Sequence, residues 1–149
     1  AARILTLADG ATEPYDRLSL NIGSVAVDPH GLVGGPGVWP VKPLSQLLTL
    51  RARIEAQAAA GAAAPRIVVA GGGPSALEIA ASLCGLVERG DGRPQVTVIA
   101  PRHGAGLPPA AWSRLSAALA ERGAVLRSGL VVARTSDSVR LADGALEPC

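Results

Sequence analysis

The segment RIVVAGGGPSALEIAASL, residues 66–83, constrains the fold of this chain more than any other part of it. The run from Arg66 to Ala70 is short and mostly apolar, which predicts a strand of a parallel sheet, buried on both faces. A glycine turn follows it, and apolar residues then recur at helical spacing as far as Gly90. This order of strand, turn and helix predicts a βα unit and therefore an α/β fold.

The turn itself, residues 71–76, fits the pattern GxGxxG/A in the setting that the pattern requires. Gly71 lets the chain turn sharply off the strand, Gly73 lets the backbone approach a pyrophosphate, and Ala76 lets the helix pack close to the sheet. The helix N-terminus adds unpaired amides and a partial positive charge. We therefore expect a dinucleotide site, with a glycine turn kept only for packing as the alternative. In this turn, the residues predicted to belong to the dinucleotide site are Gly71, Gly72, Gly73, Pro74 and Ser75.

The side chain of Glu78 has two candidate roles. Ser75 and Glu78 are spaced as in a capping box, in which the two side chains accept hydrogen bonds from each other's turn amides. Alternatively, the Glu78 carboxylate faces the cofactor. Spacing does not decide between these roles.

The second strand of the predicted sheet, QVTVIA at residues 95–100, lacks a residue that dinucleotide folds usually have. Such a strand is followed by an acid that binds the adenosine ribose, about 20 residues past the glycines. Here it ends at Ala100, and Pro101, Arg102 and His103 follow. Either other groups hold the ribose, or Arg102, with His103, meets a 2′-phosphate and the cofactor is NADPH. A solvated arginine and an ordinary loop histidine remain open.

The remaining segments complete an expected Rossmann-like parallel sheet flanked by helices, with a small antiparallel β extension. Pro43 and Pro109 each suit the first turn of a helix. The expected elements are a hairpin at 2–16, a strand and a long Gly- and Pro-rich connection at 18–42, a helix from Pro43 towards Gly61, a helix from Pro109 to Gly123, and short strands thereafter.

Composition narrows the classes of partner. The 149 residues suffice for one core and one domain. Fourteen basic and twelve acidic residues are scattered along the chain, and Tyr15, Trp39 and Trp112 are the only aromatic residues, so no nucleic-acid partner is expected. No apolar run approaches the length of a membrane-spanning helix, so no membrane span is expected either.

The two cysteines, Cys84 and Cys149, form neither a CxxC pair nor a metal-ligand spacing. Cys84 falls on the apolar face of the helix after the glycine turn, where a buried thiol is usual. The sequence therefore predicts no metal site, and it fits a reducing compartment such as the cytoplasm.

Several segments together resemble the NAD(P)H-binding domain of FAD-dependent pyridine nucleotide-disulfide oxidoreductases. IVVAGGGPSALEIAASL resembles its glycine motif, which continues GxGxxGxE and places the family glutamate on Glu78. LADGATEPYDRLSLNIGS resembles the stretch that leads into this domain, and AALAERGAVLRSGLVV resembles its exit, so the likeness covers nearly the whole chain. LNIGS and WPVKPLSQLL are most similar to the type II NADH dehydrogenase branch, particularly the dehydrogenase-like proteins associated with selenide, water dikinase.

The resemblance implies a parent enzyme in which NADH or NADPH lies on this domain and passes a hydride to FAD held elsewhere. Neither an FAD-binding glycine motif nor a CxxxxC redox pair is present, so we assign no catalytic residue and expect the isolated chain to be inactive. Residues 1–40 and 140–149 would be short pieces of the FAD domain, and the chain an excised fragment. The FAD domain is then the expected partner, and a homo-oligomer stays open.

Other interpretations also stay open. Lys42, the only lysine, is either solvated or a cofactor contact. A free-standing dinucleotide-sensing or interaction module is the alternative function. Methyl transfer from S-adenosylmethionine also uses a glycine-rich turn, but it normally needs an acid where Ala100 stands.

Two segments of the chain are nearly identical. LADGATEPY at residues 7–15 and LADGALEPC at 141–149 differ only at Thr12/Leu146 and Tyr15/Cys149. Nothing between them recurs, so a duplicated domain is excluded. Both segments predict Asp-Gly hairpins, and we expect them to mark the two boundaries of the nucleotide domain.

Overall fold

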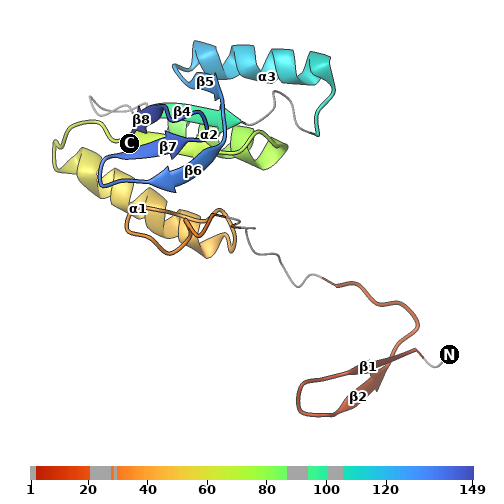
Figure 1. The fold of residues 1–149 in the computed structure, drawn as a ribbon. Helices are drawn as coiled ribbons and strands as arrows, with labels where there is room; N and C mark the ends of the chain where they lie inside the picture. Colours follow the sequence, from red (N-terminus) through yellow and green to blue (C-terminus); the bar gives the residue numbers. More distant parts are fainter. Residues whose placement is uncertain (1–2, 21–27, 29, 87–93, 101–105) are drawn as a thin grey trace.

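A computed structural model describes residues 3–20, 28, 30–86, 94–100 and 106–149 (Figure 1). Its strands form three sheets: β1 and β2 pair antiparallel, β3, β4 and β5 are parallel, and β6, β7 and β8 are antiparallel. In chain order the elements are β1 (Ile4–Thr6), β2 (Thr12–Pro14), α1 (Ser45–Ala59), β3 (Arg66–Ala70), α2 (Pro74–Gly85), β4 (Gln95–Ala100), α3 (Pro109–Glu121), β5 (Val125–Ser128), β6 (Val131–Arg134), β7 (Ser138–Leu141) and β8 (Leu146–Pro148).

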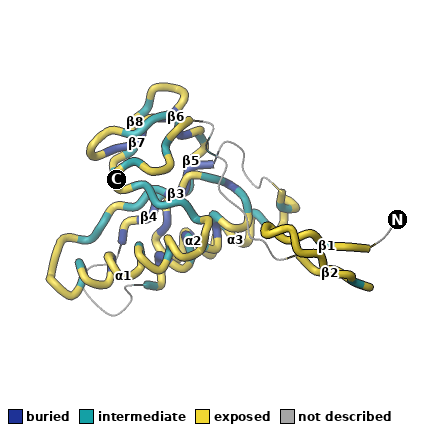
Figure 2. The backbone as a smooth tube through the Cα atoms, turned by 90° about the horizontal axis from the view of Figure 1, so that it is seen from below, coloured by how far each residue is buried: buried dark blue, intermediate teal, exposed yellow. Residues whose placement is uncertain are grey.

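The parallel sheet separates two apolar cores. Val96 and Val98 of β4 lie in the first core, together with buried residues of α1, α2 and α3. Ile99 faces the other way, into a second core with Val131 of β6 and Leu141 of β7. Apart from the N-terminal hairpin, the described residues therefore form three layers: helices, parallel sheet and antiparallel sheet (Figure 2).

This arrangement confirms a mixed α/β fold with a parallel sheet, and it corrects the expected position of the antiparallel strands. Helices were expected to flank the sheet, with the last strands as an extension of it. Among the described residues, α1, α2 and α3 all pack on one face, and β6–β8 cover the other. The physical reason is that Ile99 and Val68 present a second apolar face that must also be buried.

The strand RIVVA, residues 66–70, was predicted to be buried on both faces, and this prediction is wrong. In β3 only Val69 is buried, whereas Arg66 and Ala70 are exposed. β4 is the strand that is buried along most of its length. The reason is position, because β4 is the central strand of the described sheet and β3 lies at its edge.

The helices follow the predicted pattern but shift at their ends. α1 begins at Ser45 rather than Pro43, and it ends at Ala59, before the left-handed Gly61. α2 is described as far as Gly85, and its expected end at Gly90 lies outside the described residues. Cys84 is buried on α2, as expected. None of the helices in the described residues has the length and apolar character needed to cross a membrane.

The two near-identical segments fold into the same turn. At the first, the Leu7 amide donates to the Ala11 carbonyl at 2.8 Å, and at the second Leu141 donates to Ala145 at the same distance. Gly10 and Gly144 adopt φ values of 85° and 88°, which glycine tolerates and other residues disfavour. Both Asp-Gly hairpins are thus confirmed, in β1–β2 and in β7–β8.

One turn in the connection before α1 is held by a carboxylate. Asp28 accepts hydrogen bonds from the amides of Leu32 at 2.9 Å and Val33 at 2.6 Å. This turn places Leu32 against the second core. A strand was expected at the start of the segment from residue 18, and residues 21–27 of that segment lie outside the described residues.

We expect the Asp28 turn to weaken in acid. The two backbone amides favour the charged carboxylate, so the pKa of Asp28 lies below its ordinary value of 3.8. A lowered pKa in the folded state means that the contribution to stability is complete above pH 3.8 and is lost as the pH falls through the folded-state pKa. Acid titration of the Leu32 and Val33 amide signals by NMR should show this transition, and Asp28→Asn should remove it. A transition that persists in Asp28→Asn would assign it to another group.

Candidate functional site

The glycine turn lies at the carboxyl edge of the parallel sheet, between β3 and α2 (Figure 1). The Gly71 amide donates to the Ile99 carbonyl at 2.8 Å, which continues the β3–β4 ladder by one step. Gly71 then turns with φ at 139°, and a Cβ there would lie 3.5 Å from Cβ of Ala76. The sharp turn and the close helix approach therefore both depend on Gly71 and the small residue at 76.

Gly73 has a different geometry. It is the N-cap of α2, with extended φ and ψ values of −83° and 172° that any residue can adopt. A Cβ built on it would have no atom within 4 Å. The space beside Gly73 is open among the described residues, so a ligand can reach the backbone there.

The start of α2 offers free donors. The amides of Gly72, Gly73 and Ser75 have no hydrogen-bond acceptor among the described residues, whereas Ala76 donates to the Gly73 carbonyl at 3.1 Å. No side chain caps α2, and no acid lies in its first turn. Unpaired amides at a positive helix end attract an anion. The turn thus fits a pyrophosphate, which these amides would hold.

The capping-box interpretation is wrong. The helix begins at Pro74, with Gly73 as N-cap, so Ser75 lies inside its first turn and no side-chain cap bond forms. Pro74 favours this earlier start because its fixed φ suits the first helical position and it has no amide to satisfy. Glu78 is exposed on α2, and none of the described residues pairs with its carboxylate. Glu78 remains available for a ligand.

Ala100 ends β4 beside the glycine turn, without offering a polar side chain. It is 2% exposed, and its carbonyl accepts from the Gly129 amide at 2.9 Å. Because it is so fully buried, its side chain offers a bound ribose almost no contact surface. Arg102 and His103 lie outside the described residues. Lys42 is exposed next to Pro43, before α1.

The two cavities described in the structure do not touch the glycine turn. The larger, about 970 Å³, lies between α1 and α2, and the smaller, about 180 Å³, lies between β8 and the amino ends of β3 and β4. A helix N-terminus binds anions through backbone amides and needs no cavity. Of the three residues that carry the free amides, Ser75 is exposed, Gly73 is half-buried and Gly72 is buried. The site is therefore defined by its backbone geometry.

Sequence reasoning missed the role of Glu147. It accepts hydrogen bonds from the Thr97 hydroxyl at 3.0 Å and from Arg127, and thereby ties β8 to the parallel sheet. Glu13, its counterpart in the first Asp-Gly segment, is exposed on β2. The local sequence is the same at both places, so only the tertiary position distinguishes the two glutamates.

Comparison with known proteins supports the fold. No protein-family model matches the chain, and no curated protein sequence matches it. Putidaredoxin reductase, solved in its covalent complex with putidaredoxin, shares the fold with a TM-score of 0.64 and 20% identity, over 99% of this chain and 36% of that one. LpdA from Mycobacterium tuberculosis gives a TM-score of 0.59 and 22% identity, over 97% and 29%. The chain thus spans about a third of the length of these proteins.

Proposed function

We propose that this chain is the NAD(P)H-binding domain of a flavin-dependent oxidoreductase. The observation that carries the proposal is the turn between β3 and α2, with unpaired amides and open space beside Gly73. The sequence resemblance and the shared fold both support the superfamily of pyridine nucleotide-disulfide oxidoreductases. Within it, the type II NADH dehydrogenase-like branch, including the proteins associated with selenide, water dikinase, is our finer proposal.

In this role the chain binds and orients the cofactor. The amides of Gly72, Gly73 and Ser75 donate to the pyrophosphate, and the positive end of α2 stabilises its charge. Glu78 is an exposed polar contact on α2, and the buried Ala100 closes the end of β4 beside the turn. When bound, NAD(P)H supplies the hydride that FAD accepts, and the protein's part is to position the reacting rings.

The N-terminal hairpin supports docking to a further domain that holds the FAD. It stands apart from the three-layered body (Figure 1), and a two-stranded hairpin is at best marginally stable in water alone. Its segment also carries exposed apolar side chains, which indicate a covered surface in the intact protein. These are Ile4, Leu7, Leu18 and Leu20.

The test is a titration of the chain with NADH and NADPH by calorimetry. We expect saturable binding of at least one of them, at micromolar to millimolar concentration. ADP-ribose should compete, since it carries the same pyrophosphate. A chain that binds neither nucleotide at millimolar concentration, while circular dichroism shows it folded, would contradict the proposal.

Arg102→Ala tests the cofactor's 2′ preference. If Arg102 meets a 2′-phosphate, the substitution should weaken NADPH binding about tenfold or more, since a hydrogen bond to a charged group contributes about 1.5–3 kcal/mol. NADH binding should change little. The matched control is Arg114→Ala, which removes an exposed arginine from α3 and should affect neither nucleotide. Equal affinities of wild type and Arg102→Ala for NADPH would remove Arg102 from the site and leave the pyrophosphate assignment standing.

A further inference from the structure

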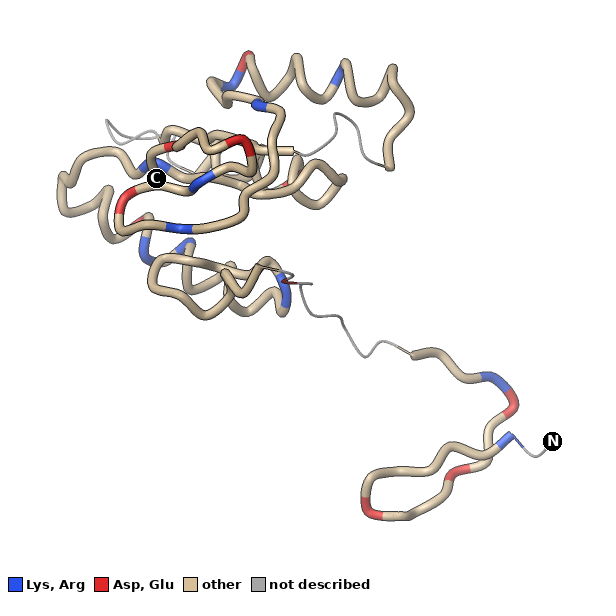
Figure 3. Tube along the Cα trace, in the orientation of Figure 1, with Lys and Arg blue, Asp and Glu red and all other residues tan. Residues whose placement is uncertain are grey.

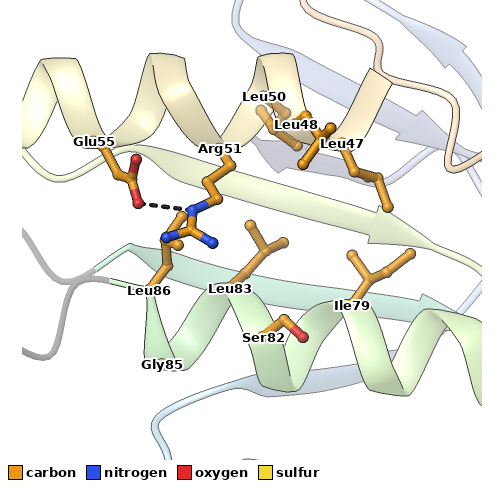
Figure 4. Close-up of a pocket in the computed structure, with 10 residues that line it drawn as sticks. All are labelled: Leu47, Leu48, Leu50, Arg51, Glu55, Ile79, Ser82, Leu83, Gly85 and Leu86. Carbon is orange, nitrogen blue, oxygen red and sulfur yellow. Dashed lines mark hydrogen bonds and ion pairs between the residues drawn. The ribbon is translucent and has the colours of Figure 1, made fainter. Parts of the chain in front are cut away.

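The cavity between α1 and α2 is an apolar groove with one charged pair on its wall. Leu47 and Leu48 of α1 face Ile79 and Leu83 of α2, and Leu86 just after it, across the groove (Figure 4). Arg51 and Glu55 line the same groove, and the Arg51 Nε donates to the Glu55 carboxylate at 2.8 Å. The side chains of this pair remain 62% and 47% exposed.

The helix α1 also leaves apolar side chains in solvent beside this groove. Leu44 and Leu48 are 71% and 70% exposed. Leu48, Arg51, Glu55 and Ala59 follow one another at spacings of three or four residues, which places them on one face of the helix. This face, together with Leu44, is called the α1 stripe below. It lies to the side of Ile54, the residue of α1 that is buried in the first core.

We infer that the α1 stripe and the adjoining groove form the interface of a two-fold symmetric dimer of this chain. The charges indicate a second copy as the occupant. Arg51 and Glu55 are one helical turn apart, so an antiparallel α1 pair brings each arginine opposite the partner's glutamate. A parallel pair would oppose like charges, which is unfavourable.

The sizes of the side chains match the same arrangement. On the side of α1 that the core does not cover, large side chains come first, with Leu44 just before the helix and Leu48 in its first turn, whereas exposed alanines follow at positions 52, 56 and 59. Antiparallel pairing lays the large side chains of one helix against the small ones of the other, so the helix axes can approach closely. On α2, Ser82 and Gly85 add room on the far wall of the groove.

Neither the dinucleotide turn nor the N-terminal hairpin takes part in this interface, so the inference does not depend on the proposed function.

The first measurement is the mass of the chain in solution by sedimentation velocity. We expect a concentration-dependent equilibrium between the 14.9 kDa monomer and twice that mass. Leu48→Asp should abolish the dimer and leave the circular dichroism spectrum unchanged, because Leu48 is exposed in the monomer. A wild-type chain that is monomeric at every concentration at which it stays dissolved would overturn the inference and indicate another occupant.

A charge exchange makes the test specific. The Arg51→Glu chain carries acids at both positions, and the Glu55→Arg chain carries arginines at both. Each should be shifted towards the monomer, with a dissociation constant raised about tenfold or more, because self-pairing opposes like charges. Mixing the two variants should restore a dimer with one copy of each.

The control is Arg53→Glu, which makes the same change of net charge as Arg51→Glu. Arg53 is exposed but two residues away along the helix, so it lies on the opposite side from the stripe. Dimerisation should therefore survive in Arg53→Glu. The assigned pairing would be contradicted if Arg51→Glu and Arg53→Glu weakened the dimer equally. It would also be contradicted if the mixture of the Arg51→Glu and Glu55→Arg chains formed no dimer.

Discussion

Gly73→Val should weaken NAD(P)H binding strongly while the chain stays folded. The backbone of Gly73 is extended and its Cβ direction is empty, so valine fits the fold without strain. The new side chain would occupy the space through which a pyrophosphate reaches the amides of Gly72 and Gly73. Loss of two such charge-assisted hydrogen bonds, each contributing about 1.5–3 kcal/mol, should weaken binding about a hundredfold or more. Calorimetric titration measures the affinity, and chemical denaturation shows that the free energy of unfolding changes by less than about 1 kcal/mol.

The matched control is Gly85→Val at the other end of the same helix. Gly85 is exposed, and a Cβ there also has no atom within 4 Å. Because it lies far from the first turn of α2, its substitution should leave the affinity for NADH and NADPH unchanged. Binding that survives in Gly73→Val at wild-type affinity would show that the pyrophosphate does not lie on this turn.

The glycine turn also shows how far the sequence could predict the site. The pattern assigned distinct roles to Gly71 and Gly73, and the structure gives them distinct geometries. Gly71 has a φ value of 139° and lies close to Ala76, whereas Gly73 is extended beside open space. Such features are local, because a strand, a turn and a helix adjacent in sequence fix their own geometry. The N-cap could not be predicted in the same way, since Ser75 and Pro74 both carry signals for the start of a helix.

Features that depend on contacts between distant segments were not predictable. The sequence indicated short strands after Gly123, but not that they would cover the second face of the parallel sheet. Nor did it reveal that Glu147 bonds to Thr97, 50 residues away in the chain. The exposed leucines of α1 are a similar case, because helical periodicity predicts an apolar face without saying how much of it the rest of the chain covers.

Ile99→Ala should cause a large loss of stability, because this residue joins the parallel sheet to the antiparallel one. Ile99 is 1% exposed, and it packs with Val131, Val139 and Leu141 from β6 and β7. Truncation of a buried isoleucine to alanine costs about 2–5 kcal/mol, from lost burial and from the cavity that remains.

Chemical denaturation should therefore give a free energy of unfolding lower by this amount in Ile99→Ala, and hydrogen exchange should accelerate in β6–β8. The control is Val125→Ala on β5, where the side chain is 53% exposed and the expected change is within about 0.5 kcal/mol. From the parallel sheet, the apolar side chains that pack against the antiparallel layer are Ile99 and Val68, so few other apolar contacts can compensate among the described residues. If the free energy of unfolding fell no more in Ile99→Ala than in Val125→Ala, the second core would not be what holds the two sheets together.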